Sequence, residues 1–305
     1  MKPTAKYIHL LFVATLLWPA GCVQSQWEPC TPKMNTTIHF SLMDKEDNDV
    51  FLATVYRVDL FLFDASGRLV TPQSEENLPG KKRLQLDPGT YSVVAWANAT
   101  PLYTRFVTQA HTHWLDMSNN YVLTAMGTAE DGDPLYYAPT ATERLLTITV
   151  PPQGQIETTA EFRHAHVKVE VTVEGYDHPS THASTDPLRM ELTEITSRYG
   201  FGMDPHGNRV SYIRHAHPID PQKKIFNTLF HVPVFDHATP VKLLIAHENG
   251  HAIIPPISIR ELLDNKIEIE KLTYLPIRVT FDDQLQVAIS VDLPEWGEHM
   301  VKPNI

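Results

Sequence analysis

The sequence has few cysteines, few glycines and no excess of basic residues. Its 305 residues include 2 Cys and 13 Gly, and 36 Asp and Glu against 25 Lys and Arg give a formal net charge of −11. A composition that is 42% hydrophobic, with so little glycine, is typical of a globular protein and excludes a disordered or collagen-like chain. The acidic balance would repel nucleic acid, so we predict no nucleic-acid partner.

Long apolar runs are also missing from the body of the chain. Beyond the N-terminal region, no stretch approaches the roughly 20 apolar residues that a membrane-spanning helix needs. The one apolar run that stands out covers residues 8–18, near the N-terminus. We therefore expect the body to be soluble, or to be attached to a membrane by something other than a transmembrane helix.

The N-terminus is organised like an export signal. Lys2 and Lys6 precede the apolar run, and residues 19–21 (Pro-Ala-Gly) follow it directly before Cys22. A basic start, a short apolar helix and small residues at the cleavage site are typical of secretory signal peptides. A buried N-terminal helix is the alternative, but the run is short and ends in Pro-Ala-Gly. We predict a lipoprotein signal peptide over residues 1–21.

Residues 20–22 (Ala-Gly-Cys) resemble the lipobox of bacterial lipoproteins, in which the cysteine thiol receives a diacylglyceryl group. Pro19 departs from that motif, which usually has Leu at this position. A Cys22–Cys30 disulfide is the alternative, but it would close only a small loop at the mature N-terminus. We therefore predict that Cys22 is the lipid attachment site and that residues 22–35 form a tether. Acyl chains stabilise membrane attachment by about 0.8 kcal/mol per buried methylene.

Short segments of alternating apolar and polar residues dominate the rest of the chain, which contains 24 Pro. Alternation predicts strands, and their regular spacing with little helix favours β-sandwiches over alternating β/α units. The breaker Pro-Pro-Gln-Gly at residues 151–154 divides the body into two predicted sandwich domains, residues 36–153 and 154–305. The predicted strands cover residues 36–42, 51–64, 68–70, 83–86, 91–97, 121–125, 144–150, 162–173, 188–198, 226–232, 240–247, 251–258, 274–281 and 285–293, and a short helix is predicted over residues 259–272.

The alternation also predicts which faces are buried. In residues 51–64 the predicted core face consists of Tyr56, Val58, Leu60 and Leu62. In residues 162–173 the predicted core face consists of Ala165, Val167, Val169, Val171 and Val173. Residues 64–67 and 282–283 are predicted to be hairpin turns.

Four segments in the first half form a combination that resembles one family. They are Ala20-Gly21-Cys22, Cys30-Thr31-Pro32, the strand that ends in Phe63-Asp64-Ala65-Ser66-Gly67, and the strand from Pro88-Gly89-Thr90-Tyr91 to Trp96-Ala97-Asn98. In this order they are similar to the fimbrial anchor-subunit lipoproteins (FimB-like) of type V pili in Gram-negative anaerobes. The resemblance covers the first domain well and the second loosely.

The resemblance implies two transthyretin-like β-sandwich domains in tandem and attachment to the outer membrane through Cys22. It implies that the protein anchors a pilus, limits its length and binds other pilus subunits. It implies no catalytic residues and no cofactor. The alternative is a surface lipoprotein that binds a glycan or a host protein through its loop tips.

Residues 247–251 (His-Glu-Asn-Gly-His) match the zinc-hydrolase motif H-E-x-x-H letter for letter. That motif binds zinc only on a helix, where both histidines lie one turn apart. Asn-Gly between two apolar strands instead predicts a hairpin tip. We therefore predict that the protein is not an enzyme. The histidine pairs His164/His166 and His215/His217 could each bind a metal ion from one strand face. No carboxylate or cysteine stands at matching spacing, so we predict solvated strand faces and loops.

The C-terminal residues 297–305 are short and polar, and Pro303 would interrupt strand pairing. This tail is predicted to be a poor donor strand for a neighbouring subunit. Together with a lipid at the N-terminus, it suits a terminal subunit that accepts a neighbour's strand but passes none on.

Overall fold

The computed structural model describes residues 34–76, 80–109, 112, 116, 119–125, 128–129, 131–138, 146–176, 186–220, 222, 224–236, 238–263, 272–293 and 297–301. Among these residues the helices are two short turns, α2 (Phe51–Thr54) and α3 (Ile259–Leu262), and the chain is otherwise built from strands and connections. The predicted all-β class is confirmed. The predicted signal peptide, Cys22 and Cys30 lie outside the described residues.

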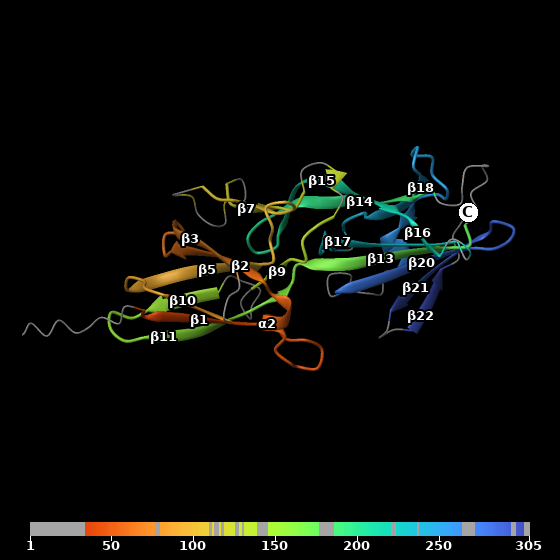
Figure 1. Cartoon of the computed structure of the whole chain (residues 1–305). Coiled ribbons are helices and arrows are strands. Elements are labelled where there is room, and N and C mark those ends of the chain that lie inside the picture. Colours follow the sequence, from red (N-terminus) through yellow and green to blue (C-terminus); the bar gives the residue numbers. More distant parts are fainter. Residues whose placement is uncertain are drawn as a thin grey trace, which may run out of the picture.

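Two sheets face each other to form a first sandwich (Figure 1). One sheet has the order β11-β1-β4 and consists of β1 (Thr36–Ser41), β4 (Lys81–Leu84) and β11 (Ile156–Glu161). The other sheet consists of β2 (Arg57–Asp64), β3 (Leu69–Glu76), β5 (Gly89–Ala97), β9 (Tyr136–Tyr137), β10 (Leu146–Val150) and β12 (Arg163–His164). Its order is β12-β9-β5-β2-β3, and β10 also pairs with β5.

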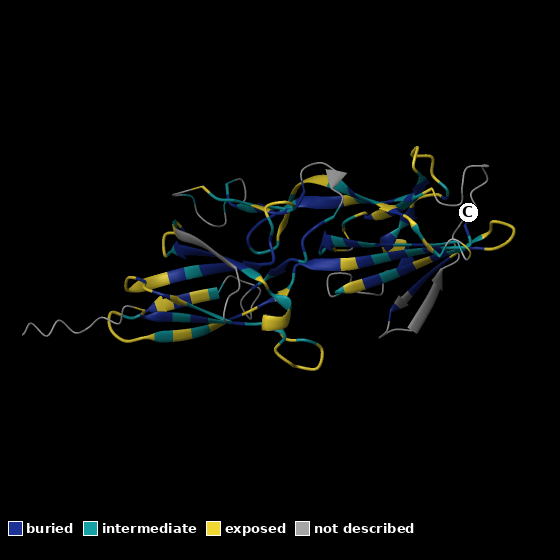
Figure 2. Cartoon of the chain, viewed as in Figure 1, coloured by how far each residue is buried: buried dark blue, intermediate teal, exposed yellow. Residues whose placement is uncertain are grey.

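The core of the first sandwich is built from alternate residues of these strands. In β1, Ile38 and Phe40 are buried, and the residues that follow each of them are partly exposed. Phe40, Phe51 and Phe162 form a ring cluster with centroids 5.6–5.9 Å apart. Figure 2 shows the resulting bands of buried and exposed residues along the strands.

The predicted strand over residues 51–64 begins later than expected, because residues 51–54 form α2. One carboxylate oxygen of Asp49 accepts hydrogen bonds from the backbone N–H groups of Leu42 (3.1 Å) and Phe51 (3.0 Å). These bonds close a loop that turns the Phe51 ring into the core, where it is 1% exposed. A local side-chain bond of this kind competes with strand formation.

Strand β2 is buried on both faces, which alternation did not predict. Val58, Leu60 and Leu62 pack into the first core as expected, but Tyr56 is 46% exposed. The opposite face, with Asp59, Phe61 and Phe63, is also buried. The Asp59 carboxylate is paired with the guanidinium of Arg57 at 3.0 Å, which compensates its burial.

The second sandwich also consists of two sheets. One has the order β16-β17-β13-β20-β21-β22 and contains β13 (His166–Glu174), β16 (Pro218–Asp220), β17 (Ile225–Pro233), β20 (Tyr274–Phe281), β21 (Val287–Leu293) and β22 (Gly297–Val301). The other has the order β19-β18-β14-β15-β8 and contains β8 (Thr128–Ala129), β14 (Leu188–Tyr199), β15 (Pro205–Ala216), β18 (Lys242–His247) and β19 (Ile257–Ser258). Two further strands, β6 (Arg105–Val107) and β7 (Tyr121–Leu123), pair with each other, and β7 also pairs with β14.

The core of the second sandwich confirms the predicted apolar face of β13. Val167, Val169, Val171 and Val173 are each 0% exposed and belong to one cluster that spans both sheets. Nearby, the strand predicted over residues 251–258 is wrong, because only β19 forms there, and β15 was not predicted. The predicted helix over residues 259–272 begins as the single turn α3, and residues 264–271 lie outside the described part of the chain.

The chain passes back and forth between the two sandwiches, so strands of one half of the sequence belong to the sandwich of the other half. β6, β7 and β8 come from the first half of the chain but belong to a sheet of the second sandwich. β11 and β12 follow the predicted boundary at residues 153 and 154 but pair with β1 and β9 of the first sandwich. We therefore propose a domain boundary near Ala165, with β6, β7 and β8 contributed to the second domain.

The C-terminal segment has a partner in its own sheet. β22 pairs antiparallel with β21 over five residue pairs, from Leu293 opposite Gly297 to Ile289 opposite Val301. It is the edge strand of that sheet. The structure therefore places residues 297–301 in an intramolecular strand.

Candidate functional site

The first candidate for a functional site is the end of the first sandwich where the chain enters it. The register places the start of β1 beside the end of β4 and the start of β11, since Thr36 pairs with both Leu84 and Ile156. The turns after β2, β4 and β10 lie at the same end of the strands. Any pull on the N-terminal segment must therefore enter the fold here.

Asn35 fixes the chain at this entry point. It is 7% exposed, and its amide Nδ2 donates to the carbonyl oxygen of Leu86 (2.7 Å) while its Oδ1 accepts from the backbone N–H of Leu86 (3.0 Å). Its own backbone N–H donates to Leu84 O (3.1 Å), and its carbonyl accepts from the N–H of Ile156 (2.9 Å). Asn35 thus joins the entering chain to neighbours on both sides.

Strand β1 continues this arrangement. It lies between β11, with which it pairs in parallel over six residue pairs, and β4, with which it pairs antiparallel over four. Tension along β1 would therefore act on two rows of backbone hydrogen bonds at once. This end of the sandwich can resist a pull that arrives through residues 34–35.

We expect Asn35→Ala to lower the free energy of unfolding by about 1–3 kcal/mol, because it leaves the buried N–H and C=O of Leu86 without their partner. Urea denaturation followed by circular dichroism measures this loss. Asn208→Ala serves as control, because Asn208 is exposed and its substitution should cost less than about 0.5 kcal/mol. Equal losses in the two variants would show that Asn35 does not hold the entry point.

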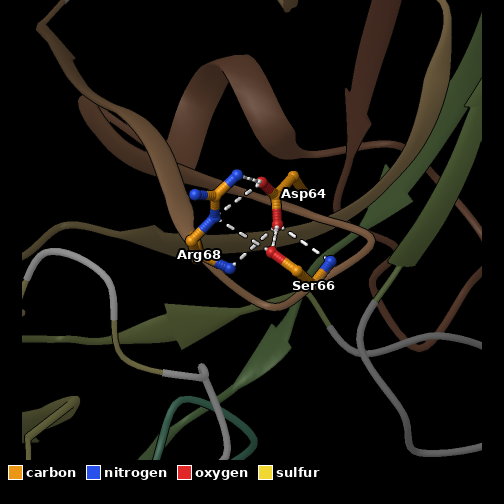
Figure 3. A network of polar contacts seen from close by, with 3 residues as sticks. All are labelled: Asp64, Ser66 and Arg68. Atoms are coloured by element: carbon orange, nitrogen blue, oxygen red, sulfur yellow. Dashed lines mark hydrogen bonds and ion pairs between the residues drawn. The ribbon is translucent and has the colours of Figure 1, made fainter.

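The hairpin turn between β2 and β3 lies at this same end and confirms the predicted turn (Figure 3). The Asp64 carboxylate accepts from the Ser66 hydroxyl (2.5 Å), from the backbone N–H groups of Ser66 (2.9 Å) and Arg68 (3.0 Å), and from the Arg68 guanidinium (3.2 Å). The Ser66 hydroxyl is the main cause that lowers the pKa of Asp64 to about 2. Gly67 has φ +78°, which glycine adopts without strain.

The second candidate feature is the junction between the two sandwiches, where a shared apolar cluster covers the outer face of β2 and β5. Phe201, which follows β14, lies with its ring centroid 5.1 Å from that of Phe61 and 6.0 Å from that of Phe63. Phe106 of β6 lies 5.1 Å from Phe61 and 6.2 Å from Trp96. Side chains of both sandwiches therefore form one core, and the sandwiches are coupled mechanically.

Polar contacts reinforce the junction. The Asp131 carboxylate accepts from the backbone N–H of His231 (3.0 Å) and pairs with the guanidinium of Arg214 (3.2 Å). A Cβ atom at the adjacent Gly132 would lie 2.3 Å from the carbonyl oxygen of His231, so this close approach requires glycine. The segment that crosses back from β8 to β9 is thus bound to the second sandwich as well.

The sequence predicted that His164 and His166 lie on a solvated strand face. This prediction is wrong, because both rings pack at the junction. Their rings lie 5.3 Å apart, and the ring of His166 lies 5.9 Å from that of His231. His166 is 0% exposed and donates through Nδ1 to the carbonyl of Leu135 (2.7 Å). Burial lowers the pKa of His166 to about 3 and that of His164 to about 4. Within the described residues, no three His, Cys, Asp or Glu side chains are arranged to hold a metal ion.

Acid is expected to destabilise the protein through His164. The unfolded chain takes up this proton near pH 6.5, whereas folded His164 stays neutral down to about pH 4. The free energy of unfolding should therefore fall as the pH drops through this window. His164→Phe removes one of the two titrating groups at similar volume and should reduce the slope, as measured by urea denaturation at several pH values, while buried His166 keeps its own contribution. His217→Phe is the control, because His217 is exposed and its substitution should leave the slope unchanged. An unchanged slope in His164→Phe would show that His164 does not cause the acid sensitivity.

Residues 247–251 form a hairpin tip, as predicted. β18 ends at His247, the N–H of Gly250 donates to the carbonyl of His247 (2.9 Å), and Gly250 has φ +88°. The side chains diverge: His247 Nε2 is hydrogen-bonded to the Tyr176 hydroxyl (3.1 Å), and Glu248 pairs with His215 Nδ1 (2.9 Å). This geometry differs from the helical zinc motif.

Solved structures with the same fold come from Bacteroides and Porphyromonas species. A candidate adhesin from Bacteroides ovatus matches with a TM-score of 0.67 and 14% identity, over 90% of this chain and 98% of that one. A candidate polysaccharide-binding protein from Bacteroides thetaiotaomicron matches with a TM-score of 0.65 and 14% identity, over 88% of this chain and 98% of that one. The fimbrial anchor protein Mfa2 from Porphyromonas gingivalis matches with a TM-score of 0.62 and 16% identity, over 88% of this chain and 99% of that one. At these identities the matches show the fold alone.

No curated protein matches the sequence closely enough to be counted as a relative. None of the helices in the described residues is long and apolar enough to cross a membrane. Residues 28–302, however, match the family described as fimbrillin-A associated anchor proteins Mfa1 and Mfa2. Because this match spans both sandwiches and most of the chain, the protein belongs to the Mfa2 family of fimbrillin-A associated anchor proteins.

Proposed function

We propose that this protein ties a pilus to the outer membrane through a lipid on Cys22. Membership of the anchor family over residues 28–302 is the observation that carries the proposal. The export signal followed by residues 20–22 (Ala-Gly-Cys) supports the lipid. Other pilus subunits are the expected protein partners, and no catalytic activity is proposed.

The geometry of the entry point suits this role. The 14 residues from Cys22 to Asn35 can extend at most about 50 Å, so the first sandwich stays close to the membrane. Tension from the pilus would reach the tether through the shared junction core and then through β1 with its two neighbours. Each of these connections is buried or hydrogen-bonded on both sides.

We also propose that the protein ends the fibre and so limits its length. A subunit held by a lipid at its N-terminus cannot add a further subunit on the membrane side. Its C-terminal segment is engaged as β22 in its own sheet, which supports a subunit that donates no strand. Open backbone groups at a sheet edge are where a neighbour's strand would add.

Deletion of the gene for this protein is the test of the anchoring role. Pili should then move from the cell fraction into the culture medium, and the wild-type chain supplied in trans should return them to the cells. Immunoblots of pilus subunits in the two fractions measure the distribution. Pili that stay on the cells of the deletion strain would contradict the proposal.

A further inference from the structure

A cavity of about 600 Å³ lies at the junction between the two sandwiches. Tyr137 of β9 with Arg163 and His164 of β12 line it from the first sandwich. Asp204, Asp236 and Leu272 line it from the second. Sites for small ligands commonly have this volume and lie between domains.

Several polar groups in this cavity lack protein partners among the described residues. Nδ1 of His164 is buried without a hydrogen bond. Arg163 and Asp204 are exposed residues that line the cavity, and they form no ion pair in the described part of the chain. Asp236 uses only Oδ1, which accepts from the backbone N–H (3.0 Å) and the hydroxyl (2.8 Å) of Thr239. Buried polar atoms are normally hydrogen-bonded, so a polar molecule in the cavity would supply the partner that His164 Nδ1 lacks. The exposed side chains of Arg163, Asp204 and Asp236 can bond to the same molecule.

The mixture of groups restricts the chemistry of that molecule. The two carboxylates that line the cavity, Asp204 and Asp236, disfavour phosphates and other polyanions. The Arg163 guanidinium on the same cavity disfavours a polyamine. The same groups offer hydrogen-bond donors and acceptors to hydroxyl groups that can do both. Tyr137, half-buried with its ring 5.8 Å from that of Trp96, and Leu272 add apolar walls.

We propose that this junction cavity binds a neutral sugar, as a monosaccharide or a disaccharide end. Its hydroxyl groups bond to Arg163, Asp204, Asp236 and His164, and its C–H faces pack on Tyr137 and Leu272. Since the cavity is lined by both sandwiches, the bound sugar also bridges them. The proposal is independent of the anchoring role, because it concerns the purified protein without its pilus.

Saturation-transfer NMR on the purified full-length protein in detergent tests the proposal. The probes are glucose, galactose, mannose, N-acetylglucosamine, N-acetylgalactosamine, lactose, maltose, cellobiose and diacetylchitobiose, with N-acetylneuraminic acid and spermidine as charged comparisons. At least one neutral sugar should bind at millimolar concentration or below, and the charged probes should bind more weakly. Calorimetry then gives the dissociation constant for the best probe.

Arg163→Gln and Asp204→Asn should each weaken that binding by roughly tenfold or more, because each removes a charged hydrogen-bonding partner. Both residues are exposed, so the variants should remain folded, which circular dichroism checks. Arg105→Gln and Asp283→Asn change exposed residues outside the cavity and should bind as the wild type does. Absence of binding by every neutral sugar, tighter binding of a charged probe, or unchanged binding in both cavity variants would overturn the proposal.

Discussion

Phe201→Ala is expected to lower the free energy of unfolding by about 3–5 kcal/mol. Phe201 is 2% exposed, and it comes from the second sandwich but packs against Phe61 and Phe63 of the first. Truncation leaves a cavity where the two sandwiches share their core, and backbone pairing on both sides prevents the site from collapsing. The loss should therefore lie in the upper range for a core substitution.

Urea denaturation followed by tryptophan fluorescence and circular dichroism measures this loss. Trp96 belongs to the same cluster, so it contributes a signal from the junction to the fluorescence of the five tryptophans. Leu102→Ala is the control, because Leu102 is 77% exposed and should cost less than about 0.5 kcal/mol. A loss below about 1 kcal/mol in Phe201→Ala would show that the sandwiches are not coupled through this core.

Cys22→Ser is expected to abolish membrane attachment. The serine hydroxyl cannot replace the thiol that accepts the diacylglyceryl group, and without acyl chains the protein loses about 0.8 kcal/mol for every methylene that was buried. Detergent partition and incorporation of labelled fatty acid measure the effect. Cys30→Ser is the matched control and should remain lipidated and membrane-bound. Labelled fatty acid in the Cys22→Ser variant would contradict the assignment.

The features that the sequence predicted correctly depend on local patterns. The buried valines of β13 follow from alternation alone, and the turn at residues 64–67 follows from its Asp-Ala-Ser-Gly sequence. The hairpin at residues 247–251 was also predictable, because Asn-Gly between apolar strands outweighs the match to a zinc motif. In each case the deciding contacts lie within a few residues along the chain.

The features that it missed depend on contacts between distant segments. The outer face of β2 is buried because Phe106 and Phe201 cover it, and alternation within residues 51–64 carries no information about them. No local motif marks Asn35, since its partner Leu86 is 51 residues away. His164 and His166 fall on the polar side of an alternating run, yet the crossing of the chain between the sandwiches buries His166 fully and His164 partly.

The position of the protein on isolated pili tests the central claim most directly. In cells that carry only the Cys22→Ser variant, pili should be shed with the variant still bound, because its body is unchanged. Immunogold labelling of these pili should place the protein at one end of each fibre. Labelling along the shafts, or pili without the protein, would contradict its role as the terminal, membrane-anchoring subunit.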